Sequence, residues 1–156
     1  MSRDVAAALG AIFKAYDVRG TYPEQIDADL ARRIGTGFAR FVAEAEPDTT
    51  RVVVGHDMRP SGPELVDAFC EGVNGEGLDV VEIGLASTDM LYFASGKLAA
   101  PGAMFTASHN PAQYNGIKMC LSSAKPIGSD TGLSTIRDIA AVADTVGDGN
   151  GSRSSQ

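Results

Sequence analysis

The chain has 156 residues, a length typical of a single domain, and its 44% hydrophobic and 21% charged residues are ordinary for a globular protein. Its formal net charge of −7 argues against a nucleic-acid partner, because binding to a phosphate backbone needs a basic surface. No apolar run reaches the roughly 20 residues of a membrane span, and the first residues lack the layout of a secretion signal. We therefore expect a cytoplasmic protein without a membrane partner.

The first half of the chain predicts an extended piece, two helices and a strand. Ile12 and Phe13 open the extended piece, which runs to a turn at Gly20. Apolar residues recur every three or four positions over 26–45, as in an amphipathic helix. The β-branched run 51–55 predicts a buried strand, and Ser61 is the expected N-cap of a helix that ends near Gly75.

The second half alternates in the same way. It predicts a strand at 80–84, a helix capped by Ser87 or Thr88, strands at 103–107 and 117–121, and a helix at 134–146. The short loop between the last two strands makes them antiparallel. This order predicts an α/β fold, a three-layer α/β/α domain over residues 1–146 with a mixed, mostly parallel sheet. The glycine- and serine-rich residues 147–156 are expected to be disordered or part of a linker. Cys70 and Cys120 are expected to be buried free thiols.

Three polar segments follow predicted strands, where open parallel sheets bind their ligands. They are residues 14–20, 55–62 and 106–111. Together they would bring basic side chains to one edge of the sheet: Lys14, Arg19, His56, Arg59, His109 and Lys118. A phosphate-bearing small molecule suits such an edge, whatever the total charge of the chain.

Ser108 is open to three interpretations. It could be a turn serine that caps backbone amides, which is the default for a serine at a strand end. It could be a nucleophile activated by His109, although adjacent side chains diverge at a strand end and a Gly-x-Ser-x-Gly elbow is missing. It could also carry a phosphoryl group, for which the candidate donors and cations are Arg19, His109, Asn110 and Lys118.

Three motifs in order resemble those of the α-D-phosphohexomutase superfamily. Thr106-Ala107-Ser108-His109-Asn110-Pro111, with Tyr114-Asn115-Gly116-Ile117-Lys118, is similar to its active-serine signature. Residues 13–20 resemble the opening segment of the bacterial phosphomannomutase/phosphoglucomutase branch, and residues 55–62 its Gly-x-Asp-x-Arg-x-Ser segment. Residues 84–88 resemble a fourth segment, so the likeness covers nearly all of 12–140.

The resemblance implies a role for each matching residue. Ser108 would be the phosphoserine that exchanges its phosphoryl group with a mannose or glucose 1- or 6-phosphate through a hexose bisphosphate. An oxygen of its phosphate would be one ligand of a Mg²⁺ ion. The other implied site residues are Arg19, His109 and Lys118 for catalysis, and Tyr16, Asn110, Lys14 and Arg59 for substrate or phosphate contacts. For Arg59, a role in holding its own loop or an interdomain surface is the alternative.

The resemblance also implies a limit. Family members have four domains, and the metal loop, the sugar-selecting loop and the phosphate clamp belong to the second, third and fourth. Asp148 and its neighbours do not supply that metal loop, since further aspartates and a preceding strand are missing. We expect the chain to fold without turning over hexose phosphates; the alternative is a non-catalytic phosphosugar-binding or scaffold domain. Preference for mannose or glucose and the oligomeric state stay open.

Overall fold

The computed structural model describes residues 4–155 and arranges its strands in one seven-stranded sheet. The order across the sheet is β1-β5-β4-β2-β3-β7, with β6 paired to β5. The strands are β1 Val18–Thr21, β2 Arg51–His56, β3 Asp79–Leu85, β4 Gly102–Phe105, β5 Tyr114–Leu121, β6 Lys125–Pro126 and β7 Arg153–Ser155. Within residues 4–155, β5 alone runs antiparallel to the other strands. The predicted mixed, mostly parallel sheet is confirmed.

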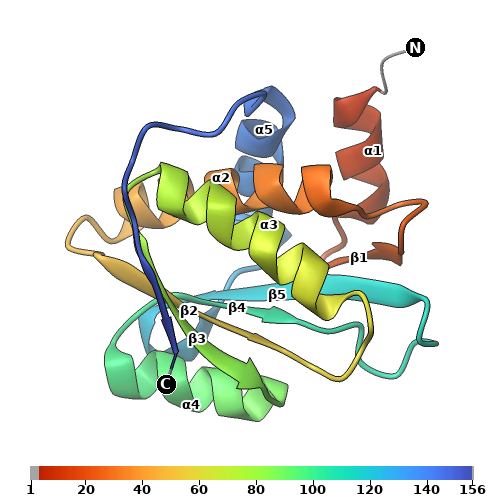
Figure 1. The fold of residues 1–156 in the computed structure, drawn as a ribbon. Coiled ribbons are helices and arrows are strands. Elements are labelled where there is room, and N and C mark those ends of the chain that lie inside the picture. Colours follow the sequence, from red (N-terminus) through yellow and green to blue (C-terminus); the bar gives the residue numbers. More distant parts are fainter. Residues whose placement is uncertain (1–3, 156) are drawn as a thin grey trace.

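Helices cover both faces of this sheet, which confirms the three-layer α/β/α fold (Figure 1). Four of them lie on one face: α1 Val5–Ile12, α2 Ala28–Ala45, α3 Gly62–Gly75 and α5 Leu133–Val142. On the opposite face lies α4, Thr88–Leu98, whose first turn is capped by Ser87 as predicted, through a 3.1 Å bond from the Met90 amide. Short 3₁₀ turns occupy Ser122–Ala124 and Ser129–Thr131.

The hydrophobic core follows this layering. Its larger part lies between the sheet and the four-helix layer, where the ring of Phe69 packs against those of Phe38 and Phe105 with centroids 5.7 and 5.2 Å apart. A smaller part, with Leu91 and Met104, lies under α4. Cys70 and Cys120 are buried free thiols, as expected. The two clusters lie on opposite faces of the sheet, so a strand residue that belongs to one of them faces that side.

Glycines in the helices of the larger layer serve a packing purpose. A Cβ at Gly35 of α2 would overlap the backbone carbonyl of Phe69, and one at Gly72 of α3 would overlap that of Arg32. The absence of side chains therefore lets α2 and α3 approach backbone to backbone. Glycine costs about 1 kcal/mol in a helix interior, and here the close packing of two helices offsets that cost.

The structure corrects three expectations. Ile12 ends helix α1 instead of opening an extended piece, and Phe13 then forms an isolated bridge with Val18. Ser61 precedes α3 but makes no capping bond; its hydroxyl accepts a 2.8 Å bond from the Asn115 side chain. In the region expected to be disordered or a linker, residues 153–155 form strand β7, which pairs in parallel with β3.

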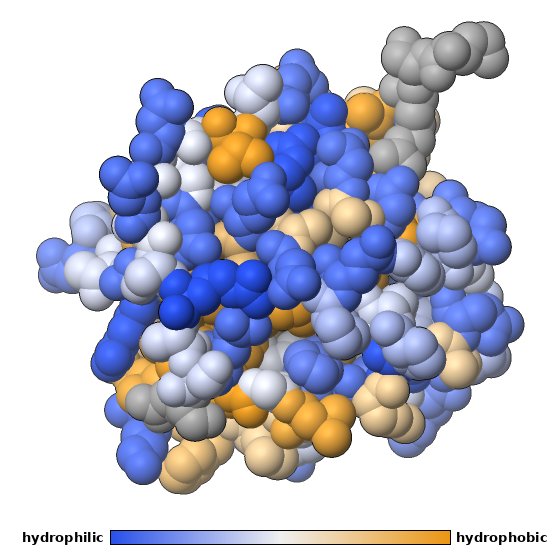
Figure 2. All heavy atoms as spheres, in the orientation of Figure 1, coloured by the Kyte–Doolittle hydropathy of each residue, from blue (hydrophilic) through white to orange (hydrophobic). Residues whose placement is uncertain are grey.

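The surface in view is mostly hydrophilic (Figure 2). Hydrophobic residues gather at its lower end, where Figure 1 places α4. The exposed Met90 and Phe93 belong to that helix. None of the helices within residues 4–155 combines the length and apolar character that a membrane span requires.

Candidate functional site

Ser108 lies on an exposed loop between β4 and β5, at the carboxyl end of β4. Its backbone adopts a left-handed conformation with φ of 54°, which is uncommon for a residue other than glycine. Asn110 closes the turn, since its backbone and side-chain N–H groups both donate to the Ala107 carbonyl, at 3.0 and 2.8 Å. The serine hydroxyl therefore lies at the tip of a turn with defined geometry.

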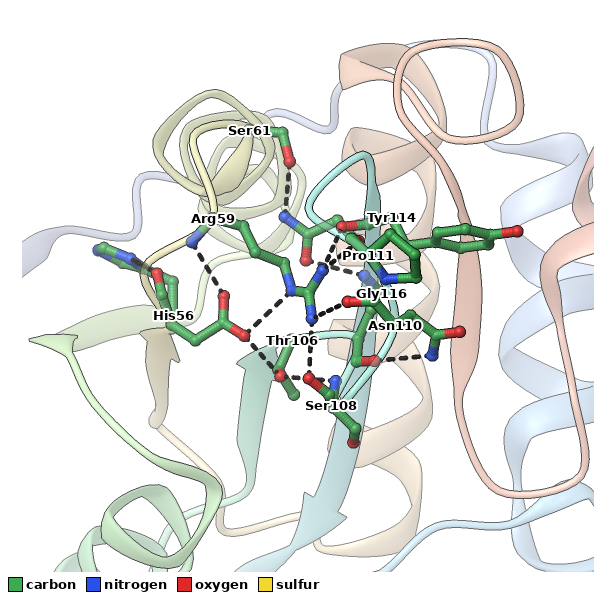
Figure 3. Close-up of polar contacts among 12 residues, drawn as sticks. His56, Arg59, Ser61, Thr106, Ser108, Asn110, Pro111, Tyr114 and Gly116 are labelled. Atoms are coloured by element: carbon green, nitrogen blue, oxygen red, sulfur yellow. Dashed lines mark hydrogen bonds and ion pairs between the residues drawn. The ribbon is translucent and has the colours of Figure 1, made fainter.

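The guanidinium of Arg59 lies beneath this loop, where only 4% of the residue is exposed. It donates to four backbone carbonyls of the loop (Figure 3). The donor–acceptor distances are 2.8 Å to Ser108, 3.0 Å to Asn110, 2.7 Å to Pro111 and 3.0 Å to Tyr114. One side chain from the loop after β2 thus fixes the path of the whole serine loop.

The Asp57 carboxylate completes the network. It accepts bonds from the backbone N–H and the Nε–H of Arg59, both at 3.2 Å, and from the Thr106 hydroxyl at 2.7 Å. The Thr106 oxygen in turn accepts the Ser108 N–H at 3.0 Å. Arg59 therefore holds the Ser108 carbonyl while Asp57, through Thr106, holds its amide (Figure 3).

This geometry favours the loop-holding role considered for Arg59. A guanidinium has five N–H donors, and all five are engaged by the four carbonyls and Asp57. In this structure Arg59 therefore holds the serine loop, and a phosphate contact by its side chain stays a prediction.

Four of the predicted site residues line a cleft of about 440 Å³ beside β1 and β5. They are Lys14, Tyr16, Arg19 and Lys118, and the remaining lining residues are Ala15, Asp17, Tyr92 and Pro126. The Lys14 ammonium also donates to the Ala11 carbonyl at 2.9 Å. Three cations against one carboxylate make the cleft suitable for an anion.

The sheet register explains why Arg19 and Lys118 meet. Arg19 of β1 lies opposite Gly116 of β5, and Lys118 follows two residues later on the same face of that strand. Lys118 lies opposite Met104, which belongs to the smaller core under α4. Both cations therefore point to the α4 side of the sheet.

Tyr92 of α4 joins these cations, and the sequence did not single it out. Burial raises the pKa of its phenol, so its hydroxyl stays protonated and can donate to an anion at neutral pH. No sequence signal marks Tyr92 as a site residue, because only the packing of α4 across the sheet brings it to the cleft. Asp57 and Thr106, by contrast, belong to motifs already recognised, yet their roles depend on contacts between distant segments.

The other predicted residues have separate positions. Ser108 and His109 are exposed on their loop and do not line the cleft, whereas Asn110 shapes the loop itself. His56, at the end of β2, is half-buried, and its Nδ1 lies 2.9 Å from the Asp57 carbonyl. The structure thus brings the predicted residues together as two neighbouring groups, the serine loop and the cationic cleft.

Gly116 joins these groups, because it lies opposite Arg19 and its carbonyl accepts the Thr106 amide at 3.0 Å. A Cβ at this position would overlap the Val18 carbonyl and lie 3.0 Å from that of Thr106. Gly116→Ala should force β1 away from β5 and lower the free energy of unfolding by about 1–3 kcal/mol, the usual cost of overpacking. Urea denaturation measures this loss, with Gly96→Ala as the control, since a Cβ at Gly96 meets no atom within 4 Å. Equal urea midpoints would contradict the prediction.

The side chains of residues 4–155 do not by themselves make a magnesium site. Within residues 4–155, no group of three or more His, Cys, Asp and Glu side chains could hold a metal ion. The carboxylate nearest the serine loop in the network, Asp57, is occupied by Arg59 and Thr106. Mg²⁺ prefers about six oxygen ligands, and the side chains within residues 4–155 offer no cluster that could supply them.

Comparisons with known proteins agree with the motifs. Residues 10–146 match the family described as phosphoglucomutase/phosphomannomutase, alpha/beta/alpha domain I. The chain is 49% identical over 138 residues to a Xanthomonas campestris protein named "Phosphohexose mutases", covering 88% of this chain and 30% of that protein. It is 42% identical over 129 residues to a Klebsiella pneumoniae phosphomannomutase, covering 82% of this chain and 79% of that one.

A solved structure shares the fold. A phosphoglucomutase/phosphomannomutase family protein from Burkholderia thailandensis superposes with a TM-score of 0.81 and 35% identity, covering 99% of this chain and 33% of that one. The chain thus spans about a third of the length of the Xanthomonas and Burkholderia proteins. On the family match, the sequence identity and the shared fold, this chain belongs to the phosphoglucomutase/phosphomannomutase family and spans its domain I.

Proposed function

We propose that the chain is the phosphoryl-carrying part of a phosphohexomutase, with Ser108 as the carrier and a mannose or glucose 1- or 6-phosphate as substrate. The observation that carries the proposal is the exposed Ser108 hydroxyl on a loop held by Arg59, next to a cleft lined by three cations. Phosphoryl transfer asks a protein mainly for positioning and charge neutralisation, and these two groups supply them.

The proximity of loop and cleft follows from three neighbouring strand positions. Thr106, Gly116 and Arg19 lie side by side through the Thr106–Gly116 hydrogen bond and the Gly116–Arg19 pairing. Adjacent strands are about 4.8 Å apart, so the Arg19 backbone is roughly 10 Å from that of Thr106. A group on Ser108 and a long side chain from Arg19 can meet across this distance.

The proposed reaction has two transfers of the same kind. A sugar hydroxyl attacks the phosphorus on Ser108, forming a sugar O–P bond as the Ser108 Oγ–P bond breaks. The hydroxyl proton passes to His109, and Ser108 Oγ recovers a proton from it. The bisphosphate then returns its other phosphoryl group to Ser108 by the reverse step. Arg19 and Lys118 balance the negative charge of the group in transit.

A single phosphoryl transfer needs fewer parts of the enzyme than the full cycle of two transfers. Transfer from a hexose 1,6-bisphosphate to Ser108 uses the serine loop and the cationic cleft, both present in this chain. We therefore expect slow, stoichiometric phosphorylation of the 156-residue chain by glucose 1,6-bisphosphate, read by intact mass and by mapping the phosphorylated peptide. Ser108→Ala should abolish the label. Ser123→Ala is the matched control, since Ser123 is also exposed and left-handed, with φ of 62°.

Labelling that survives in Ser108→Ala, or no label on the unchanged chain, would contradict the role of Ser108.

For the full cycle, we propose that this chain alone does not interconvert mannose 1-phosphate and mannose 6-phosphate. The reasons are that a solvent-open site weakens fixed charges and that the side chains within residues 4–155 make no metal site. Turnover in a coupled assay with Mg²⁺ would overturn that part and leave the role of Ser108 intact.

A further inference from the structure

The glycine-rich segment 147–155 runs past the end of α3 to the outer edge of β3, and its contacts are specific. Strand β7 pairs in parallel with β3, matching Val80 with Arg153 and Glu82 with Ser155. Ser152 makes the first contacts of this pairing. Its carbonyl accepts the Val80 amide at 2.7 Å, and its own amide donates to the Asp79 carboxylate at 2.9 Å. Residues 147–155 are called the edge segment below.

The glycines of the edge segment alternate at positions 147, 149 and 151. A Cβ at Gly147 would overlap the Gly75 carbonyl, one at Gly149 the amide nitrogen of Gly77, and one at Gly151 the Leu78 carbonyl. Alternate residues of an extended chain share one face. The glycines therefore form a side-chain-free face that lets the edge segment press against the turn between α3 and β3.

Backbone hydrogen bonds accompany this close approach. The Gly149 amide donates to the Gly75 carbonyl at 2.7 Å, and the Gly151 amide donates to the Asn74 carbonyl at 3.1 Å. The Asn74 side chain donates to the Ser152 carbonyl at 3.0 Å. The edge segment is thus bonded to the end of α3 before its pairing with β3 begins.

Arg153 fixes the end of the edge segment. Its guanidinium donates to the Asp67 carboxylate of α3 at 2.9 Å and to both Glu82 oxygens of β3, at 2.8 and 3.1 Å. The hydrogen bond to Glu82 is the main cause that raises the pKa of Arg153. Two carboxylates on different elements thus form an acidic socket that selects a basic side chain at this position.

We propose that the outer edge of β3 is a strand-accepting surface, built to take an extended segment with glycine at alternate positions and arginine at the acidic socket. Its occupant in this chain is the edge segment itself. Backbone pairing supplies the affinity of such strand addition, and the side-chain socket supplies the specificity. Strand β7 pairs through three residues whose side chains are exposed, so this end of the edge segment can open and a copy in trans can replace it. An open edge of this kind is also a template for unwanted pairing, which the edge segment prevents.

Amide hydrogen exchange at Val80 tests this proposal in the full chain. The measurement does not depend on the proposed role of Ser108 or on a sugar substrate. In Gly151→Ala the Cβ should lift the edge segment, and exchange of the Val80 amide should speed up by about tenfold or more. The Val53 amide, bonded to the Pro101 carbonyl at 2.9 Å inside the sheet, serves as the internal reference. Gly96→Ala is the matched glycine control and should leave Val80 unchanged.

A synthetic peptide with the sequence of residues 147–155 supplies the second measurement. Added to Gly151→Ala, it should restore slow exchange at Val80, whereas the same peptide with alanine in place of Arg153 should bind more weakly. Equal Val80 exchange in Gly151→Ala and Gly96→Ala would overturn the proposal. So would a peptide that leaves Val80 exchange unchanged, because the edge would then lack the recognition proposed for it.

Discussion

Arg59→Ala should lower the free energy of unfolding by about 3–5 kcal/mol, the cost of removing one partner from a buried ion pair. The substitution leaves the Asp57 carboxylate without its cation and four loop carbonyls without their donor. Burial makes each loss expensive, because water reaches these groups poorly. Chemical denaturation in urea measures the change.

Arg51→Ala is the matched control. Arg51 is exposed and makes one 3.2 Å bond to the Leu98 carbonyl, so its loss should change the stability by less than about 0.5 kcal/mol. An unfolding midpoint for Arg59→Ala equal to that of Arg51→Ala would contradict the structural role of Arg59.

Arg59→Lys keeps the prediction testable where the alanine variant does not fold. A lysine retains the charge opposite Asp57 but has three N–H donors in place of five, without the planar fork that reaches several carbonyls. We expect a protein that still folds but in which glucose 1,6-bisphosphate phosphorylates Ser108 more slowly than in the unchanged chain. Labelling at the unchanged rate would show that the loop carbonyls do not need Arg59 to position the serine.

Local signals account for most of what the sequence predicts correctly. Apolar periodicity over 26–45 and the β-branched run at 51–55 are properties of neighbouring residues, and both elements lie where expected. The parallel order of the sheet then places the ends of β2 and β4 at one edge, which is why the polar segments after them meet. The family motifs that indicate Ser108, Arg19 and Lys118 are contiguous in the same way, and the roles of these residues stay predictions.

Apart from the helix that ends at Ile12, the features that the sequence missed depend on contacts between distant segments. Gly35 and Gly37 of α2 count as helix-weakening until α3 is packed against the first and α5 against the second. Ser61 is a residue type that commonly caps a helix, but here its hydroxyl accepts a hydrogen bond from the buried Asn115 of β5. The edge segment has the composition of a linker, and its extended strand exists because the end of α3, the β3 edge and the acidic socket each match it.

Ser108→Gly should separate the stability of the fold from its proposed chemistry. A left-handed backbone costs a residue with a Cβ about 1–2 kcal/mol, and Ser108 with its φ of 54° bears that strain. Glycine removes the strain but loses about 0.5–1 kcal/mol more conformational entropy on folding. The net result should be a gain in stability of about 0.5–1 kcal/mol, together with complete loss of phosphorylation at this position.

Ser123→Gly provides the comparison, because Ser123 is equally exposed and has a φ of 62°. It should gain similar stability in urea denaturation while Ser108 is still labelled by glucose 1,6-bisphosphate. If Ser108→Gly were instead less stable than the unchanged chain, the serine side chain would be supporting the loop. That result would favour the interpretation of Ser108 as a turn serine that caps backbone amides. If Ser108→Gly is more stable, the loop in the unchanged chain is strained, and that strain does not serve the stability of the fold. Strained backbone of this kind persists where the surroundings over-determine it, as Arg59 and Thr106 do here, and it is a feature of sites that must present a reactive group.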